Sequence, residues 1–314
     1  MNKEFQVGDL LYISTGDNQA SVYRAVNKNN NNQEIPQPRF SFETYDEDFL
    51  ELLQIAGVSL DNYLKSLPLK CPEDWAWLQI APPEIAFQHL CVSYKQYMLC
   101  IIVGLYQEDE NGNGRGYYPE QMHMNLLREC ETHGMTPCLF LIDTQTGDPV
   151  LPPCYLVDAR SYEPIQLDDL KEDNKGLMSE WEINNLGVSC VCNYLAQNGC
   201  SEIAYCDVVG ITPQIWFKKD GEHCYAYVRA IPRGLMANAY VINKNTLERY
   251  HENKGYFVNL EFCNIVGNNG EFMDKQLYRR SPLVHSHINL MEIDKAIQTY
   301  DFIQLIDTPS FAVN

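Results

Sequence analysis

The stretch from residue 98 to residue 142 constrains the fold of this chain more than any other segment. Residues 98–106 are apolar apart from one glycine, and so short a run cannot cross a bilayer, so it predicts a buried β-strand. Residues 119–133 begin with proline, carry apolar side chains on one face and end at Gly134, which predicts a helix. Residues 137–142 predict a second buried strand. This order predicts a βαβ unit with a parallel strand pair and a right-handed crossover.

A second helix follows, and several short strand candidates come after it. Ser179 and Glu182 have the spacing of a capping box, and an apolar stripe continues from there to Gly199. Asp220 and Gly221 form a turn signal between two strand candidates. The strands that the pattern predicts are residues 203–206, 214–218, 224–231, 256–263, 283–288 and a segment around Tyr240. We therefore expect an α/β or α+β fold with a mixed β-sheet flanked by helices.

Composition divides the chain near residue 94. The asparagine run at residues 27–32 and a series of prolines interrupt the first part of the chain. Within it, residues 9–26 suit a hairpin and residues 43–53 suit an amphipathic helix. We expect residues 1–94 to form an N-terminal region, whose independent folding the sequence leaves open, and residues 95–314 to form an α/β core domain.

The chain is strongly acidic. It has 23 Lys and Arg residues against 42 Asp and Glu residues, so its formal net charge is −19. Nucleic acids and anionic membranes are bound through Lys and Arg, so we expect neither general nucleic-acid binding nor membrane attachment. The partner that this charge favours is a basic protein, because opposite charge accelerates encounter and sets specificity.

The cysteines and the N-terminus indicate a reducing compartment. The first residues lack the apolar core of a signal peptide, and the 12 cysteines include no Cys-x-x-Cys pair. We expect reduced thiols and a cytoplasmic location. Neither Cys190 and Cys192 nor His285 and His287 have a second pair of ligands nearby in sequence, so we expect no structural zinc and no other cofactor.

The block from residue 179 to residue 232 carries polar residues at the start of a helix and on two strands. These residues are Glu180, Glu182, Gln214, Tyr227 and Arg229. The block resembles the core of the PD-(D/E)XK nuclease superfamily, in which a helix with a Glu precedes a Pro-Asp strand and then a Glu-x-Lys strand. The resemblance implies a nuclease-like core in the C-terminal half of the chain. Gln214 then stands at the family's Asp, Tyr227 at its Glu and Arg229 at its Lys.

These replacements change the chemistry that the resemblance implies. In the family the Asp and Glu hold a divalent metal ion and the Lys helps to position the attacking water. Gln214 is neutral and Tyr227 is protonated at pH 7, so two ligands of a hard cation are missing together. We therefore expect a degenerate pseudo-nuclease without catalytic activity. The alternative is a metal-dependent nuclease or other phosphodiesterase with Mg²⁺ or Mn²⁺ that uses Glu182, Asp207, Gln214 and Arg229.

Two structural expectations accompany this resemblance. Trp216 should be buried against the helix stripe, where the helix packs on the sheet; the stripe consists of Trp181, Val188, Val191 and Leu195. Arg229 should lie beneath the start of the helix and pair with one of its glutamates or with Asp207, because a half-buried guanidinium stays charged and needs a partner. The alternative is that the aromatic residues of this block simply pack a core.

Residues 109–120 have the spacing of an EF-hand calcium loop. The ligands would be Asp109, Asn111, Asn113 and Glu120, with Gly114 at the turn position. A buried strand rather than a helix is expected before this segment, which argues against an EF-hand. The alternative is a solvated connection that leads into the next helix.

The functional expectation combines the charge with the degenerate site. Five short sequence segments also resemble segments that recur together in a group of bacterial proteins without an assigned activity. They are residues 179–182, 213–217, 228–229, 255–257 and 277–279. This second resemblance suggests that residues 120–290 form one inherited unit. We expect a non-catalytic, acidic, cytoplasmic bacterial protein that binds another protein. An immunity- or antitoxin-like role against a basic toxin is the concrete form of this hypothesis, and a small-molecule sensor is a third class that the sequence leaves open.

Overall fold

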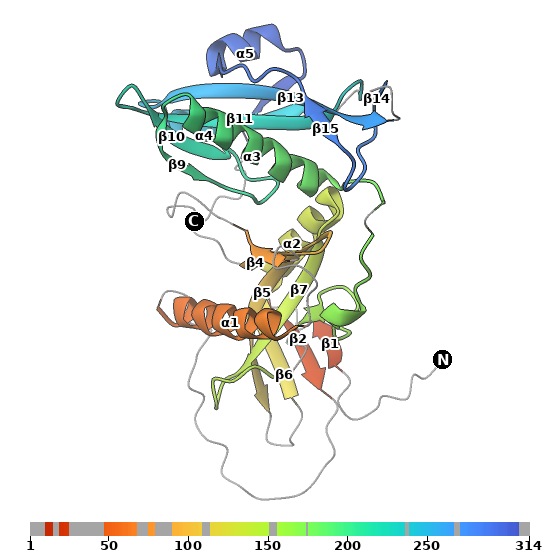
Figure 1. Cartoon of the computed structure of the whole chain (residues 1–314). Coiled ribbons are helices and arrows are strands. Elements are labelled where there is room, and N and C mark those ends of the chain that lie inside the picture. Colours follow the sequence, from red (N-terminus) through yellow and green to blue (C-terminus); the bar gives the residue numbers. More distant parts are fainter. Residues whose placement is uncertain are drawn as a thin grey trace, which may run out of the picture. The chain divides into compact units, whose positions relative to one another are not determined.

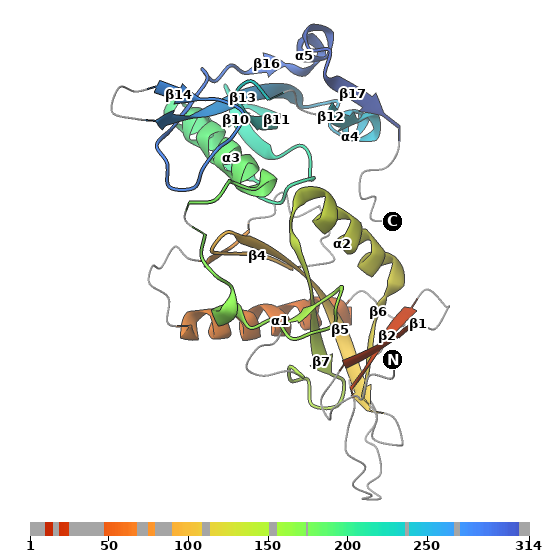
Figure 2. The same cartoon turned by 90° about the vertical axis from the view of Figure 1, so that its right-hand side faces the viewer.

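The structure is a computed structural model. It describes residues 10–14, 19–24, 47–67, 75–78, 90–108, 114–150, 156–173, 175–235, 239–266 and 271–307. The chain divides into two compact units. The first contains residues 1–77 and 87–171, and the second contains residues 78–86 and 172–314. Each unit has its own sheet and its own helices (Figure 1, Figure 2).

An eight-stranded mixed sheet forms the centre of the first unit. Its strands are β1 (Leu10–Ser14), β2 (Gln19–Arg24), β3 (Trp75–Trp77), β4 (Leu90–Tyr94), β5 (Tyr97–Glu108), β6 (Gly114–Pro119), β7 (Thr136–Asp143) and β8 (Val157–Asp158). The order is β1-β2-β6-β5-β4-β3, and β7 pairs with β5 and β8. The hairpin expected in residues 9–26 is confirmed, since β1 and β2 are antiparallel with Leu10 opposite Arg24.

The predicted parallel pair in the first unit is confirmed. β5 and β7 run parallel from Leu99 opposite Thr136 to Tyr106 opposite Asp143, and α2 (Glu120–His133) lies between them in the chain. The helix ends before Gly134, whose φ of 69° lies in the left-handed region that glycine adopts without strain. β6 also lies between the two strands, where a loop was expected, and it is antiparallel to β5 and β2.

The helix α1 (Glu47–Ser66) packs on one face of this sheet through one apolar residue in each turn. These residues, four apart, are Leu52, Ala56, Leu60 and Leu64, and all are buried. They join Ile101 of β5 and Phe140 of β7 in one core. The amphipathic helix expected at residues 43–53 is therefore present, but it begins at Glu47 and is longer, because the apolar stripe continues to Leu64.

The expected boundary near residue 94 falls inside a hairpin. β4 and β5 are antiparallel neighbours joined by Lys95 and Gln96, so residues on both sides of that boundary belong to one sheet. The change of unit comes instead after Lys171. Residues 120–290, expected to be one inherited unit, therefore extend over both compact units.

The second unit contains a seven-stranded mixed sheet in the order β14-β13-β11-β10-β9, with β15 and β16 also paired to β13. Its strands are β9 (Ser201–Tyr205), β10 (Ile215–Lys219), β11 (Glu222–Pro232), β13 (Lys254–Val266), β14 (Glu271–Met273), β15 (Leu283–His285) and β16 (Met291–Glu292). β12 (Tyr240–Asn243) and β17 (Ile303–Ile306) form a separate parallel pair. The helices are α3 (Glu180–Gln197), α4 (Lys244–Arg249) and α5 (Ile293–Thr299). The expected fold class, a mixed β-sheet flanked by helices, is confirmed.

Helix α3 covers one face of the second sheet, and α5 lies over the other (Figure 1). The predicted capping box begins α3: the Ser179 backbone N–H donates to Oε2 of Glu182 at 2.7 Å. The predicted turn is present too, since Asp220 and Gly221 both have positive φ values, 53° and 85°. Within the described residues, no helix is long and apolar enough to cross a membrane.

The expected contact between Trp181 and Trp216 is wrong. Trp181 is buried, but Trp216 packs with Tyr225 and Tyr227 on the face that α3 does not cover. The reason is the alternation of side chains along β10, since Ile215 and Phe217 point toward α3 and the residue between them must point away.

Helix α3 packs closely against β11 at Gly187, and this contact yields a prediction. A Cβ atom at Gly187 would lie 2.4 Å from Cβ of Ala230, whereas a Cβ at Gly57 of α1 would meet nothing within 4 Å. We expect Gly187→Ala to lower the free energy of unfolding by about 1–3 kcal/mol, the usual cost of an overpacked contact. Gly57→Ala should raise it by about 0.5–1 kcal/mol through helix propensity alone.

Urea unfolding of the two variants, followed by circular dichroism, measures this difference. Adding Ala230→Gly to Gly187→Ala should restore part of the lost stability. Equal stability of Gly187→Ala and the unmodified protein would contradict the close approach.

Candidate functional site

Gln214, which the nuclease resemblance aligns with an Asp, connects two strands. It lies just before β10 and is 4% exposed. Its Oε1 accepts the backbone N–H of Val228 at 2.9 Å, and its Nε2 donates to the carbonyl of Val228 at 3.1 Å and to the hydroxyl of Tyr240 at 3.2 Å. The side-chain amide therefore pairs with β11 as a peptide group would. An Asp could accept here but could not donate.

Glu182 is held by an arginine that the sequence analysis did not include among the site residues. Arg279 Nε donates to Oε1 at 2.7 Å and Arg279 Nη2 donates to Oε2 at 2.6 Å, which is a bidentate pair. The hydroxyl of Ser179 also donates to Oε2, at 2.8 Å. The side chains of Arg279 and Glu182 are only 16% and 14% exposed. The cation at this carboxylate is therefore Arg279, and the expected pairing of Arg229 with Glu182 is wrong.

The segment that carries Arg279 is fixed by a buried amide. Asn264 of β13 is fully buried, and its Oδ1 accepts the backbone N–H of Tyr278 at 3.0 Å while its Nδ2 donates to the carbonyl of Gln276. Arg279 lies 97 residues from Glu182 in sequence, so no local spacing connects them. The one signal in the sequence is the segment 277–279, which the second resemblance groups with the segment 179–182 at the start of the helix.

Arg229 lies on the sheet face away from α3. Its Nη1 donates to Oδ1 of Asn259 at 3.1 Å, and its Cζ lies 3.8 Å from the centre of the Phe302 ring. Val228 packs toward α3, so its neighbour must point to the opposite face. Burial lowers the pKa of Arg229, while the charge of Glu261 acts in the other direction. A cation stacked on an aromatic ring keeps its charge in this position.

The remaining candidates lie apart from one another. Tyr227 is fully buried between the rings of Tyr225 and Tyr240, and burial raises its pKa, so it stays a neutral phenol. Asp207 lies near Cys192, whose pKa is raised to about 12 by burial and, to a smaller extent, by that carboxylate. Glu180 is exposed in the first turn of α3. Among the described residues, no group of three His, Cys, Asp or Glu side chains could hold a metal ion.

The calcium-loop candidate is only partly visible. Asp109, Asn111 and Asn113 lie outside the described residues. Residues 114–119, the second half of the proposed loop, form β6, and Glu120 is the first residue of α2. An extended strand paired on both sides differs from the ion-wrapping backbone of an EF-hand.

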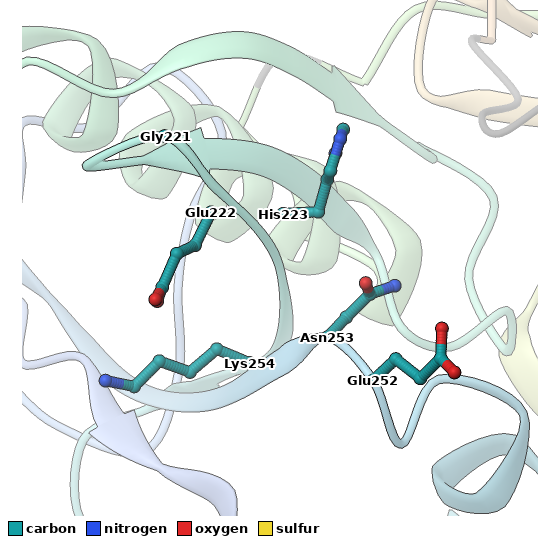
Figure 3. A pocket seen from close by; sticks show the side chains of 6 residues that line it. All are labelled: Gly221, Glu222, His223, Glu252, Asn253 and Lys254. Atoms are coloured by element: carbon teal, nitrogen blue, oxygen red, sulfur yellow. The ribbon is translucent and has the colours of Figure 1, made fainter.

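A polar recess of about 390 Å³ opens where β10 turns into β11 and where the chain enters β13 (Figure 3). It is lined by Gly221, Glu222, His223, Glu252, Asn253 and Lys254. Nζ of Lys254 lies 3.0 Å from the carboxylate of Glu292. The side chain of His223 points away from those of Glu222 and Lys254 (Figure 3). The recess is thus an open polar surface rather than a set of converging groups.

The acidic charge is distributed unequally between the two units. Most of the surplus of Asp and Glu belongs to the first unit. In the second unit many carboxylates form ion pairs. These pairs are Glu172–Arg280, Asp173–Arg279, Glu182–Arg279, Glu202–Lys218, Asp274–Arg233, Glu292–Lys254 and Asp307–Lys244. The net negative field of the chain therefore comes mainly from the first unit.

One exposed acidic stretch of the first unit is firmly anchored. Glu163, Asp168 and Asp169, which we call the acidic segment, are exposed, while Ile165 and Leu167 beside them are buried in the core under α1. After the acidic segment, the carbonyls of the next two residues accept hydrogen bonds from the side chains of the β4–β5 turn, each at 2.6 Å. These carboxylates are therefore presented on a fixed backbone, which reduces the entropy cost of binding.

Comparison with known proteins adds no family to these observations. Protein-family models, curated protein sequences and solved structures were all searched, and none of them matches the chain. The nuclease resemblance therefore depends on the residues of the block 179–232 alone.

The Gln214 contacts lead to a second prediction. Gln214→Glu keeps the shape of the side chain but removes the Nε2 donor and places a carboxyl group against the carbonyl of Val228. We expect a loss of about 1–3 kcal/mol in the free energy of unfolding, the cost of an unsatisfied buried polar group. Gln304→Glu, at an exposed position of β17, is the matched control and should change stability by less than about 0.5 kcal/mol. Chemical unfolding of both variants tests this, and equal losses would contradict the structural role of Gln214.

The Arg279 pair leads to a third prediction. Arg279→Met leaves the largely buried carboxylate of Glu182 without its cation, and we expect a loss of about 3 kcal/mol. Arg280→Met removes an exposed partner of Glu172 and should cost less than about 1 kcal/mol. Thermal unfolding of the two variants under the same conditions makes the comparison. A larger loss for Arg280→Met than for Arg279→Met would contradict the assignment.

Proposed function

We propose that this protein is a non-catalytic, cytoplasmic bacterial protein that binds a basic protein partner, and that an immunity- or antitoxin-like role against a basic toxin is its concrete form. The observation that carries the proposal is the anchored acidic segment of the first unit. Its backbone is already fixed, so a partner can bind its carboxylates without the entropy cost of ordering that part of the chain. Complementary charge of this kind increases the rate of association and selects a partner of opposite sign.

The contacts of the nuclease-like positions support the non-catalytic part of the proposal. Gln214 pairs with the backbone of β11, and Glu182 is neutralised by Arg279. Arg229 points to the other face of the sheet, where it stacks on Phe302. Each of these side chains has a structural role, and metal-dependent hydrolysis needs several carboxylates around one ion.

Charge reversal at the acidic segment tests the proposal. Tagged protein and the triple variant Glu163→Lys/Asp168→Lys/Asp169→Lys are used to capture partners from native lysate at low and high salt. The triple variant Glu248→Lys/Glu252→Lys/Asp301→Lys is the matched control, because it changes the net charge equally at exposed positions of the second unit. Mass spectrometry identifies the captured proteins.

We expect a stoichiometric basic partner whose affinity falls at least tenfold with the first triple variant and changes little with the second. The low-salt affinity should exceed the high-salt affinity, because exposed charges are screened. Recovery of no stoichiometric partner at any salt concentration, or equal loss with both triple variants, would contradict the proposal.

The nuclease alternative is tested directly. The protein is incubated with plasmid DNA and with RNA in the presence of Mg²⁺ or Mn²⁺, beside the double variant Glu182→Ala/Asp207→Ala. We expect no cleavage by either protein. Cleavage that the double variant loses would overturn the non-catalytic proposal.

A further inference from the structure

Sulfur atoms gather on one face of the first sheet, beneath α2. Sγ of Cys91 in β4 lies 3.8 Å from Sγ of Cys100 in β5, and Sγ of Cys100 lies 3.6 Å from Sδ of Met135. Cys130 of α2 also contacts the thiol of Cys100. All four residues are buried. Two thiols in contact are the arrangement from which a disulfide forms with little movement.

The strand register places the two thiols at a favourable pair of positions. Cys91 and Cys100 are directly opposite each other in the antiparallel β4–β5 hairpin, whose turn consists of Lys95 and Gln96. Hydrogen-bonded and non-hydrogen-bonded pairs alternate from Tyr94 and Tyr97, which close the turn, so Cys91 and Cys100 form a non-hydrogen-bonded pair. The Cα atoms of such pairs are about 4.5 Å apart, which is within the span of a disulfide.

Among the described residues, two further buried thiols, Cys130 and Cys138, lie near this pair, and Cys138 is on the other face of the sheet. Cys138 of β7 is fully buried, but it belongs to the core under α1 on the opposite face. Side-chain alternation prevents it from reaching Cys100 without a change of register. Cys130 can reach Cys100 only from α2, so a link between them would join a helix to the sheet.

We propose that Cys91 and Cys100 are a reversible thiol–disulfide site in the β4–β5 hairpin, oxidised by a small disulfide such as oxidised glutathione. The two thiols lose their hydrogens and form one S–S bond, while the S–S bond of the reagent is reduced to two thiols. The reaction proceeds through a mixed disulfide and needs no metal or enzyme. This site is independent of the partner proposed above.

Burial makes this reaction slow. The contact with Cys130 acts to lower the pKa of the Cys100 thiol, but the contact with Cys91 and burial both raise it. The pKa is raised on balance, so little thiolate is present. The oxidant must therefore reach the pair during local opening of the hairpin. The equilibrium after long incubation, rather than the initial rate, is the quantity to measure.

Trypsin cleavage after Lys95 makes the disulfide directly visible. Cleavage separates peptide 71–95, which contains Cys71 and Cys91, from peptide 96–115, in which Cys100 is the one cysteine. Full-length protein with Cys71→Ser is equilibrated in glutathione redox buffers and quenched with acid. Its free thiols are then blocked with N-ethylmaleimide in urea near neutral pH, and the digest is analysed by mass spectrometry. Cys138→Ala in the same background is the matched control, and circular dichroism confirms that each variant is folded.

We expect peptides 71–95 and 96–115 to be linked, and the link to disappear with dithiothreitol. The ratio of linked to free peptide should rise about tenfold for each tenfold rise in [GSSG]/[GSH]², the stoichiometry of one disulfide per pair. Cys138→Ala should leave this titration unchanged. The proposal is overturned if the folded protein shows no such link at any ratio, or if the link appears only when the redox equilibration is carried out in urea. It is also overturned if peptide 96–115 is linked instead to peptide 129–160, which contains Cys130, Cys138 and Cys154.

Discussion

The parallel pairing of β11 with β13 is the constraint on which the second unit depends. It runs from Cys224 opposite Lys254 to Pro232 opposite Phe262. Because side chains alternate along a strand, this register assigns every residue of the two longest strands to one of two faces. Ala226 and Val228 of β11 pack in the core with α3. Tyr225 and Tyr227, which alternate with them, belong to an aromatic cluster that includes residues of α5.

The same constraint organises the buried charges. Arg229 is on the aromatic face, where the ring of Phe302 and the amide of Asn259 accommodate its guanidinium. Glu182 begins α3 on the other face and receives Arg279, whose segment is held by the buried amide of Asn264. Each charge therefore has a partner on its own face, as the cost of an unpaired buried charge requires.

In the first unit, the β4–β5 hairpin connects two features that differ in chemistry. Its turn residues, Lys95 and Gln96, hold the backbone that follows the acidic segment. Its strands bring the thiols of Cys91 and Cys100 together. Both features follow from the register of the β4–β5 hairpin. The two-residue turn places Cys91 opposite Cys100, and it leaves the side chains of Lys95 and Gln96 at the turn, outside the strand pairing.

The sequence by itself determined the local elements. The capping box at Ser179, the turn at Asp220 and Gly221, the hairpin in residues 9–26 and the parallel pair around α2 could all be predicted, because each depends on backbone geometry within a few residues or on a continuous apolar period. The division into units could not be read from composition, since strands on both sides of the change in composition near residue 94 pair in one sheet.

Only the tertiary structure decided which face each site residue occupies and what it contacts. The placement of Trp216 and Arg229 depends on strand register, and a shift of one residue would exchange the faces. The pairing of Glu182 with Arg279 joins residues 97 positions apart, and no periodicity in the sequence reports such a distance. Burial and hydrogen bonding give Gln214 its role as a strand connector, and both arise only when β10 meets β11.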